Sequence, residues 1–363
     1  MIELLGAVED PRDESKIRYP LVNILFIGIC ALFCGAETWE DMSLYGQARR
    51  KWLSEYIDLS AGIPPGWTIR RAFVVIKPEH IAEVAMAVVR YLAGGKIKDH
   101  IAVDGKVSCG NRSPKRGITP LHMVSAWCEE LGLSLAEVAT DQKSNEIKAI
   151  PLLLDLLDIR DSTITIDAMG CQVAIAERIL EGGGQYVLAL KGNQGKLHEH
   201  VAAYMQQEGV KPGNLAFDRF DETHGRVTRR RYFTCAAPEA LKHGFRELNT
   251  LIATETITNR GSGVTAEWRY YISSHSPDNS KLPGYIRCHW GIENRLHWIL
   301  DVHLGDDADR KLNKNTVQIL SHLRRMVVNM VKSKPQEGRK LSIRSRLKKL
   351  SWDSDYLLGI LLQ

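Results

Sequence analysis

The feature that most restricts the fold is a change of hydrophobic period near Gly94 and Gly95. Before this Gly-Gly break the apolar residues repeat at helical spacing, and after it they alternate, which is typical of strands. Three expected strands, at 100–106, 121–130 and 133–140, are followed by a helix, a strand, a helix and a strand. The order βββαβαβ predicts a mixed α/β sheet, in which antiparallel strands adjoin parallel ones and helices cover the faces.

The fourth of these strands ends on an acid. Residues 163–167, TITID, are β-branched and alternating, and a helix is expected from Ala168 to Leu180. Ligands of such sheets bind outside the carboxyl ends of the parallel strands. Asp167 is therefore placed either for chemistry or as an ordinary helix N-cap.

Composition, charge and hydropathy divide the chain into five expected segments. Residues 1–95 are predicted to be a helical N-terminal domain, and 96–213 the first part of the sheet domain. Residues 214–275 carry short strands and are predicted to be a mostly β insertion, after which 276–312 complete the core with a strong helix. Residues 313–363 are predicted to be a basic helical C-terminal region.

The chain has 363 residues, of which 44% are hydrophobic, and this is ample for packed cores. The longest apolar run, Leu21 to Ala36, includes Asn23 and is short for a membrane span, so a buried core helix is predicted. The seven cysteines contain no C-x-x-C pair, which disfavours a disulfide framework or a zinc ribbon and favours a reducing cytoplasm.

The net charge of +5 is unevenly distributed. Between Arg324 and Lys349 there are ten Lys or Arg residues and a single acid, Glu337. A block of one sign indicates a polyanionic partner.

Three acids are candidates for chemistry. Asp104 lies within the first expected strand, Asp167 ends the fourth, and Glu293 lies on the helix after the insertion. If the two strands are neighbours and the helix packs over them, three carboxylates meet at one edge of the sheet, and hard divalent cations require such an oxygen cluster. Each acid also has an ordinary alternative, since Asp104-Gly105 is a hairpin-turn signal, Asp167 a cap and Glu293 a solvated helix residue.

The sequence around these acids resembles a known pattern. The stretches that carry the resemblance are, in order, GAETWEDM, GIPPGWTI, IAVDGK, KSNEIKAIP, TIDAMGCQ, YVLALKGNQG, RYYISS and HWGIENRLHWILDV. They are similar to motifs of the DDE transposases of bacterial insertion sequences, in particular the H-repeat-associated proteins. The resemblance covers nearly the whole chain.

The resemblance implies a ribonuclease-H-like catalytic core in which Asp104, Asp167 and Glu293 match the two aspartates and the glutamate of the family. It further implies two Mg²⁺ ions, for which Mn²⁺ can substitute, and in-line cleavage of a phosphodiester followed by attack of the freed 3′-hydroxyl on target DNA. The expected partners are double-stranded DNA, with terminal inverted repeats and target, and a second copy of the chain. The expected location is the cytoplasm, with the bacterial nucleoid.

Two other function classes stay open at this point: a domesticated or inactive DNA-binding relic, and a plain metal-dependent nuclease. One departure from the family pattern is also present. Related transposases often carry a basic residue two turns after the glutamate, where this chain has Leu300 followed by Asp301.

Polar residues near the motifs are candidate DNA contacts, although each has the alternative of being ordinary surface charge or a polar loop. Glu146 is a candidate supplementary acid, and Arg70 and Arg71 lie in a segment that is either a helix-turn-helix or a plain helical hairpin. The late helix also repeats His289, Glu293, His297 and Asp301 every four residues, which makes a zinc site conceivable. The candidate DNA contacts are Arg70, Arg71, Lys143, Asn145, Lys191, Asn193, Gln194, Arg226, Arg230, Arg287, His289, Asn294, Arg295 and His297.

Overall fold

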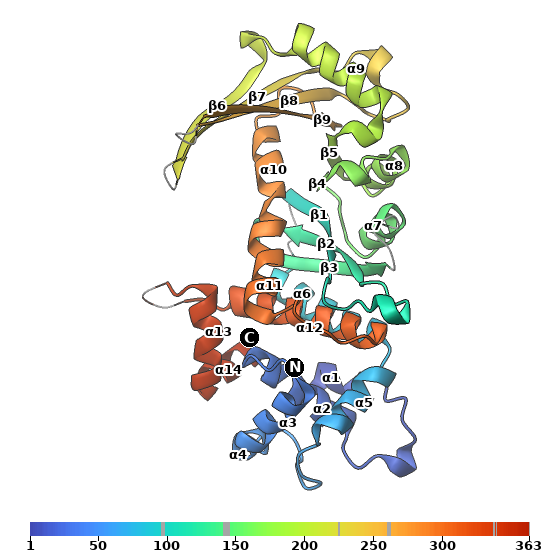
Figure 1. The fold of residues 1–363 in the computed structure, drawn as a ribbon, viewed down its shortest axis with the longest axis vertical. Coiled ribbons are helices and arrows are strands. Elements are labelled where there is room, and N and C mark those ends of the chain that lie inside the picture. Colours follow the sequence, from blue (N-terminus) through green and yellow to red (C-terminus); the bar gives the residue numbers. More distant parts are fainter. Residues whose placement is uncertain are drawn as a thin grey trace.

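A single mixed sheet runs through most of the molecule (Figure 1). The computed structural model describes residues 1–95, 99–140, 146–223, 226–259, 263–336, 338 and 340–362. Within these residues the strand order is β3-β2-β1-β4-β5-β9-β8-β7-β6. The predicted mixed α/β class is confirmed.

The first five strands follow the predicted order βββαβαβ. β1, β4 and β5 are parallel neighbours, and β2 and β3 extend the sheet from β1 as antiparallel strands. The helices α7 and α8 connect β3 to β4 and β4 to β5. The bounds are β1 Asp99–Val107, β2 His122–Cys128, β3 Leu133–Thr140, α7 Glu146–Asp155, β4 Ser162–Ile166, α8 Val173–Glu181 and β5 Gln185–Leu190.

The β-rich insertion is not a separate sheet. Its last strand, β9, pairs antiparallel with β5, so the four insertion strands continue the same sheet into the curved end seen in Figure 1. Helix α9 and the π-helical turn η6 pack on this extension through Val201 and Met205. The bounds are α9 Lys196–Tyr204, η6 Met205–Gly209, β6 Leu215–Thr223, β7 Arg226–Ala236, β8 Thr250–Asn259 and β9 Val264–Ser273.

The two faces of the sheet bury different helices because successive strand side chains point to opposite sides. Val103 and its alternating neighbours pack with α7 and α8, whereas Ala102 packs with the late helix through Ile292 and Leu296. The late helix consists of α10 Leu282–His289, a π-helical turn η9 Glu293–His297 and α11 Trp298–Leu304. In Figure 1 it runs along one side of the sheet from the insertion to the N-terminal domain.

Residues 1–95, called the N-terminal domain here, contain helices and no strand. Helix α2 is almost completely buried, and α6 ends at Gly94, whose φ of 57° is the left-handed conformation that commonly terminates helices. No helix within the described residues combines the length and the apolar character that a membrane crossing needs. The bounds are α1 Ile2–Gly6, α2 Leu21–Phe33, α3 Trp39–Ala48, α4 Arg50–Leu53, α5 Gly66–Val75 and α6 Pro78–Ala93.

The C-terminal helices are part of the N-terminal domain's core rather than a separate region. Ile319, Leu323 and Leu357 join the same buried cluster as α2, because α12 lies along α6 and β3. The bounds are α12 Lys314–Ser333, α13 Ile343–Trp352 and α14 Ser354–Leu361.

This packing also engages part of the basic block. Arg324, Arg325 and Arg346 are 3–5% exposed, and Lys332 lies over the Trp127 ring with its Nζ 4.3 Å from the centroid. Charges that are buried in internal contacts are not available to a polyanion. Lys340, Arg344 and Lys348 of the same block are exposed, so part of the block remains available to such a partner.

Candidate active site

Asp104 and Asp167 lie side by side at the carboxyl edge of two parallel strands. Val103 of β1 pairs in register with Ile166 of β4. Asp104 directly follows Val103, and Asp167 directly follows Ile166. Since Ala102 faces the late helix, the alternation along β1 turns Asp104 to that same face. Thr165 of β4 also faces the late helix, because its Oγ1 lies 2.9 Å from His289 Nδ1, and Asp167 follows two residues later.

Glu293 faces the same region from the late helix. Ile292 and Leu296 anchor this part of the helix in the core, whereas the Glu293 side chain is exposed. Its position in a π-helical turn is notable because such turns occur frequently at functional sites.

The charges of the three acids influence one another. Burial, followed by the negative charges of Asp167 and Glu293, raises the pKa of Asp104 to about 7. When the ionised form of a carboxyl group is disfavoured in this way, a bound cation stabilises it. Within the described residues, however, the ligand oxygens of these three acids do not all lie within 4.8 Å of one another.

The ordinary alternatives for the acids are partly resolved. Asp104-Gly105 lies within β1 and is not a hairpin turn. Asp167 does cap a short helical turn, η4 Ala168–Gly170, since its Oδ1 accepts a 3.0 Å hydrogen bond from the Met169 N–H. Capping occupies one carboxylate oxygen and leaves the other without a hydrogen bond from the described protein.

His297 covers Asp104. Its Nδ1 lies 3.5 Å from Asp104 Oδ2, and the residue is 8% exposed. Burial, assisted by the charges of Arg325 and Lys106, lowers the pKa of His297 to about 3, so this contact involves a neutral imidazole at neutral pH. A buried position beneath the late helix does not fit the expected direct contact with DNA.

Gly105 leaves room for a buried pair on the opposite face of β1. Glu146 Oε1 lies 2.5 Å from His122 Nε2, and the residues are 6% and 2% exposed. A Cβ on Gly105 would lie 2.3 Å from Glu146 Oε1, so no other residue fits between Asp104 and Lys106 without displacing the pair. The Glu146 charge also raises the pKa of Asp104, although less than the other acids do.

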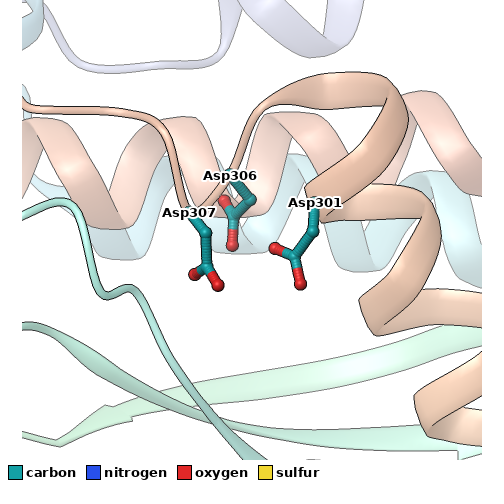
Figure 2. Close-up of side chains that lie close together, drawn as sticks. All are labelled: Asp301, Asp306 and Asp307. Carbon is teal, nitrogen blue, oxygen red and sulfur yellow. The ribbon is translucent and has the colours of Figure 1, made fainter.

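A second acidic cluster lies close by. Asp301, Asp306 and Asp307 have ligand oxygens within 4.8 Å of one another, and Figure 2 shows the carboxylates converging from α11 and the following loop. Lys106 Nζ lies 2.7, 3.6 and 2.8 Å from oxygens of these three residues respectively. The lysine therefore offsets part of the negative charge of this cluster.

Lys106 also concerns position 300, where this chain has Leu300 and related transposases often have a basic residue. The positive charge near this part of the late helix comes from a strand, two residues after Asp104, and not from the helix. The residues predicted for the site do not include Lys106. The signal was its position in IAVDGK, because alternation places residues 104 and 106 on the same face.

The polar residues after β5 support the loop that carries Asp167. Asn193 Nδ2 donates to Ala168 O at 2.8 Å, and Gln194 Nε2 donates to Cys171 O at 2.6 Å. Lys191 is exposed at the end of β5. Of these three residues, Lys191 is the one whose side chain is available for a phosphate.

Several expected DNA contacts are engaged in ion pairs. Arg230 and Arg287 both contact Asp221 Oδ2, at 2.7 and 3.3 Å, and Arg295 contacts Glu129 at 2.8 Å. These pairs connect the late helix with the insertion and with the turn between β2 and β3.

The remaining expected DNA contacts either lie on the surface or fall outside the described residues. Asn294 is exposed and donates to Trp290 O within its own helix at 3.0 Å, and Arg70 and Arg71 are exposed on α5. Lys143 and Asn145 lie outside the described residues, as does the side chain of Arg226, whose backbone begins β7.

The zinc interpretation of the late helix gains no support. His289 lies 2.9 Å from Thr165 Oγ1, and the same hydroxyl lies 2.8 Å from His100 Nε2. The π-helical turn interrupts the four-residue repeat, so His297 lies against Asp104 while Asp301 binds Lys106. His289 is thus held in a hydrogen-bonded contact with β4 rather than directed at DNA.

Comparison with known proteins identifies the class. A family model described as "Transposase DDE domain" matches residues 95–330, and another described as "DDE_Tnp_1-associated" matches residues 2–88. The chain belongs to the DDE transposase family.

Individual relatives cover the full length of the chain. It is 35% identical to "Putative transposase YncI" of Escherichia coli O157:H7, over 99% of this chain and 94% of that protein. It is 33% identical to "H repeat-associated putative transposase YhhI" of Escherichia coli (strain K12), over 99% and 97%. A cryo-EM structure of a piggyBac transposase synaptic complex with hairpin DNA aligns at 11% identity with a TM-score of 0.46, over 100% of this chain and 79% of that one, which does not establish a common fold.

Proposed function

We propose that this chain is a metal-dependent DNA transposase that hydrolyses a phosphodiester at each element end and transfers the 3′-hydroxyl into target DNA. The observation that carries the proposal is the position of Asp104 on β1 beside Asp167, which directly follows the parallel neighbour β4. Burial and the charges of Asp167 and Glu293 raise the pKa of Asp104 to about 7. Family membership supports it. The order β3-β2-β1-β4-β5 and the packed late helix support a ribonuclease-H-like core.

The donor set fits Mg²⁺. Three carboxylates without a cationic partner among the described residues are hard oxygen ligands, and like charges that converge favour a bound cation. Asp104, Asp167 and Glu293 would hold the ions, two Mg²⁺ with Mn²⁺ as a substitute. When bound, such ions lower the pKa of attacking water and neutralise charge on the attacking and leaving oxygens.

The surrounding residues have definable roles. Asn193 and Gln194 fix the loop after Asp167 and thereby the orientation of that carboxylate. His297 shields one side of Asp104 without supplying positive charge, which leaves the carboxylate available to a cation. Lys191, at the same edge, is placed to bind a phosphate of the DNA.

The wider assignment follows from this chemistry. The substrates would be double-stranded DNA with terminal inverted repeats and a target duplex, and a homodimer would bring two ends together. Residues 1–95 would assist in holding DNA, the core of 96–213 and 276–312 would cut it, and the insertion of 214–275 would contact it through Arg226 and Arg230. The protein would act in the bacterial cytoplasm on the nucleoid.

The test uses the purified chain and a duplex made from the DNA that flanks its coding region. With Mg²⁺ we expect nicking at the element end and joining of the 3′-hydroxyl to a plasmid. Asp104→Asn and Asp167→Asn should abolish both reactions, while Asp307→Asn, in the cluster that Lys106 contacts, should retain them.

Unchanged nicking in the Asp104 and Asp167 variants would refute the assignment. Nicking without joining would indicate a plain nuclease. DNA binding with no cleavage in Mg²⁺ or Mn²⁺ would indicate an inactive relic, a possibility raised by a relative named "Inactive transposase YbfQ", which is 37% identical over 20% of this chain.

A further inference from the structure

Two cavities meet at helix α5 and form one groove. The larger, of about 760 Å³, lies between α5 and the segment 12–19 of the N-terminal domain. The smaller, of about 310 Å³, lies between α5 and two loops of the sheet domain that carry Arg116 and Arg310. Arg70 and Val74 line both cavities, so the two adjoin. We call the combined feature, lined by the residues of both cavities, the α5 groove.

The α5 groove is strongly basic. Its lining includes eight Lys or Arg side chains and a single acid, Asp13. Arg70, Arg116 and Arg310 are exposed, and none has a side-chain hydrogen bond or ion pair within the described part of the chain. Like charges that converge without partners repel one another, and this repulsion is relieved when a polyanion binds.

These three arginines differ from those on the insertion. Arg229, Arg230 and Arg231 lie on one strand, and each is paired with an acid of a neighbouring strand. A paired arginine must break an existing contact before it binds phosphate, whereas Arg70, Arg116 and Arg310 need not. The groove is therefore the better phosphate-binding surface of the two.

An exposed aromatic residue adds a second type of contact. Trp67 at the start of α5 is 61% exposed, and the Arg71 guanidinium carbon lies 5.9 Å from its ring centroid. An exposed indole beside cations is suited to stacking on a base or sugar, which strengthens DNA binding in a way that salt affects little.

The groove is mechanically connected to the catalytic edge. Asn111 Nδ2 donates to Asp309 O at 2.7 Å and to Lys311 O at 2.8 Å, which joins the two loops that carry Arg116 and Arg310. Lys106 Nζ lies 2.8 Å from Asp307 Oδ1 in the second of these loops. Because Lys106 follows Asp104 by two residues, both loops are fixed relative to the carboxyl end of β1.

We propose that the α5 groove binds the phosphate backbone of the DNA duplex that is cut at the Asp104 edge. Arg70, Arg116 and Arg310 each contact a phosphate, and Trp67 stacks on the same duplex. This proposal rests on the proposed function and deepens it, since it assigns one DNA segment to the N-terminal and sheet domains together. Arg116 and Arg310 thereby become DNA contacts that the sequence motifs did not indicate.

The test measures the salt dependence of DNA binding by fluorescence anisotropy, with a labelled blunt-ended duplex of mixed sequence and a KCl series. In the Arg70→Gln/Arg116→Gln/Arg310→Gln variant, the slope of log affinity against log salt should become shallower by about 0.9 for each lost phosphate contact. Trp67→Ala should weaken binding at every salt concentration and leave the slope unchanged.

Two control variants make the measurement specific. Arg160→Gln/Arg178→Gln/Arg246→Gln removes the same charge from exposed, ion-paired arginines elsewhere and should leave the slope within about 0.5 of wild type. Arg70→Lys/Arg116→Lys/Arg310→Lys keeps the three charges and should keep the slope. This variant separates the effect of lost charge from that of misfolding.

The outcomes distinguish the two proposals. A wild-type slope in the glutamine variant overturns the proposal that the α5 groove binds DNA, even if the protein nicks DNA. A shallower slope supports the groove, even if wild type proves unable to cut and the catalytic assignment fails. Absence of salt-dependent DNA binding by wild type overturns both.

Discussion

Two acidic regions lie near each other around β1, and they differ in how their charge is balanced. Asp104, Asp167 and Glu293 face one another at the sheet edge without a cationic partner among the described residues. Asp301, Asp306 and Asp307 lie closer together, but Lys106 contacts all three and Arg324 contacts Asp306 at 3.1 Å. The tighter group is therefore the one whose charge the protein partly offsets with its own cations.

The pKa shifts express the same difference. Burial and neighbouring acids raise the pKa of Asp104 to about 7. Burial would also raise the pKa of Asp306, but the charges of Arg324, Arg325 and Lys106 outweigh it and lower the value. Asp301 is intermediate, since burial raises its pKa despite Lys106. Proximity of acids alone thus does not identify a metal site, because the uncompensated charge decides what a cation gains.

The largest effect is expected at Glu293. Glu293→Gln removes an exposed carboxylate, so stability should be unchanged, while loss of several kcal/mol of transition-state stabilisation should slow Mg²⁺-dependent nicking by about 10³-fold. Glu177→Gln, an exposed glutamate on α8 at the other face, is the matched control and should nick normally. Normal nicking by the Glu293 variant would remove that residue from the site.

A second effect is expected on stability, at the cluster of Asp301, Asp306 and Asp307. Lys106→Met leaves three close carboxylates without their main cation, which should lower the free energy of unfolding by about 3 kcal/mol in urea denaturation. Lys281→Met, which removes a lysine that is 62% exposed in its pair with Asp99, should change it by less than about 1 kcal/mol. Equal unfolding midpoints for the two variants would contradict the role given to Lys106.

A smaller effect concerns acid sensitivity next to the site. Burial, with the charge of His289, lowers the pKa of His100 from 6.5 to about 3. The folded state therefore binds fewer protons than the unfolded chain, and the stability from neutral His100 is complete above pH 6.5 and is lost as the pH falls toward 3.

His100→Gln should remove this dependence on pH. Between pH 6.5 and about pH 4, the unfolding free energy of wild type should therefore fall by roughly 3 kcal/mol more than that of the variant. Parallel curves for the two proteins, measured by urea denaturation, would show that His100 is not the residue responsible.

The sequence predicted the frame of the molecule well, since alternation and the Gly94 break follow from local backbone physics. The order βββαβαβ placed Asp104 and Asp167 on strands that the structure makes parallel neighbours. Motif resemblance identified the family.

Other features depend on tertiary partners that local patterns do not encode. The basic block between 324 and 349 looked like a surface, yet Arg324 finds Asp306 and Asp309 in a distant loop and is buried. The regular four-residue repeat of the late helix is interrupted by a π-helical turn that no spacing rule indicated. The insertion joins the main sheet because β5 has a free edge, a long-range pairing that its own alternation leaves open.

The most direct test of the central claim is a calorimetric Mn²⁺ titration of the protein in complex with the end-containing duplex. We predict that wild type and Asp307→Asn bind Mn²⁺ alike, and that Asp104→Asn and Asp167→Asn lose this binding. If the Asp104 and Asp167 variants bind Mn²⁺ as wild type does while Asp307→Asn fails to bind it, the metal lies in the cluster of Figure 2 and the account is contradicted.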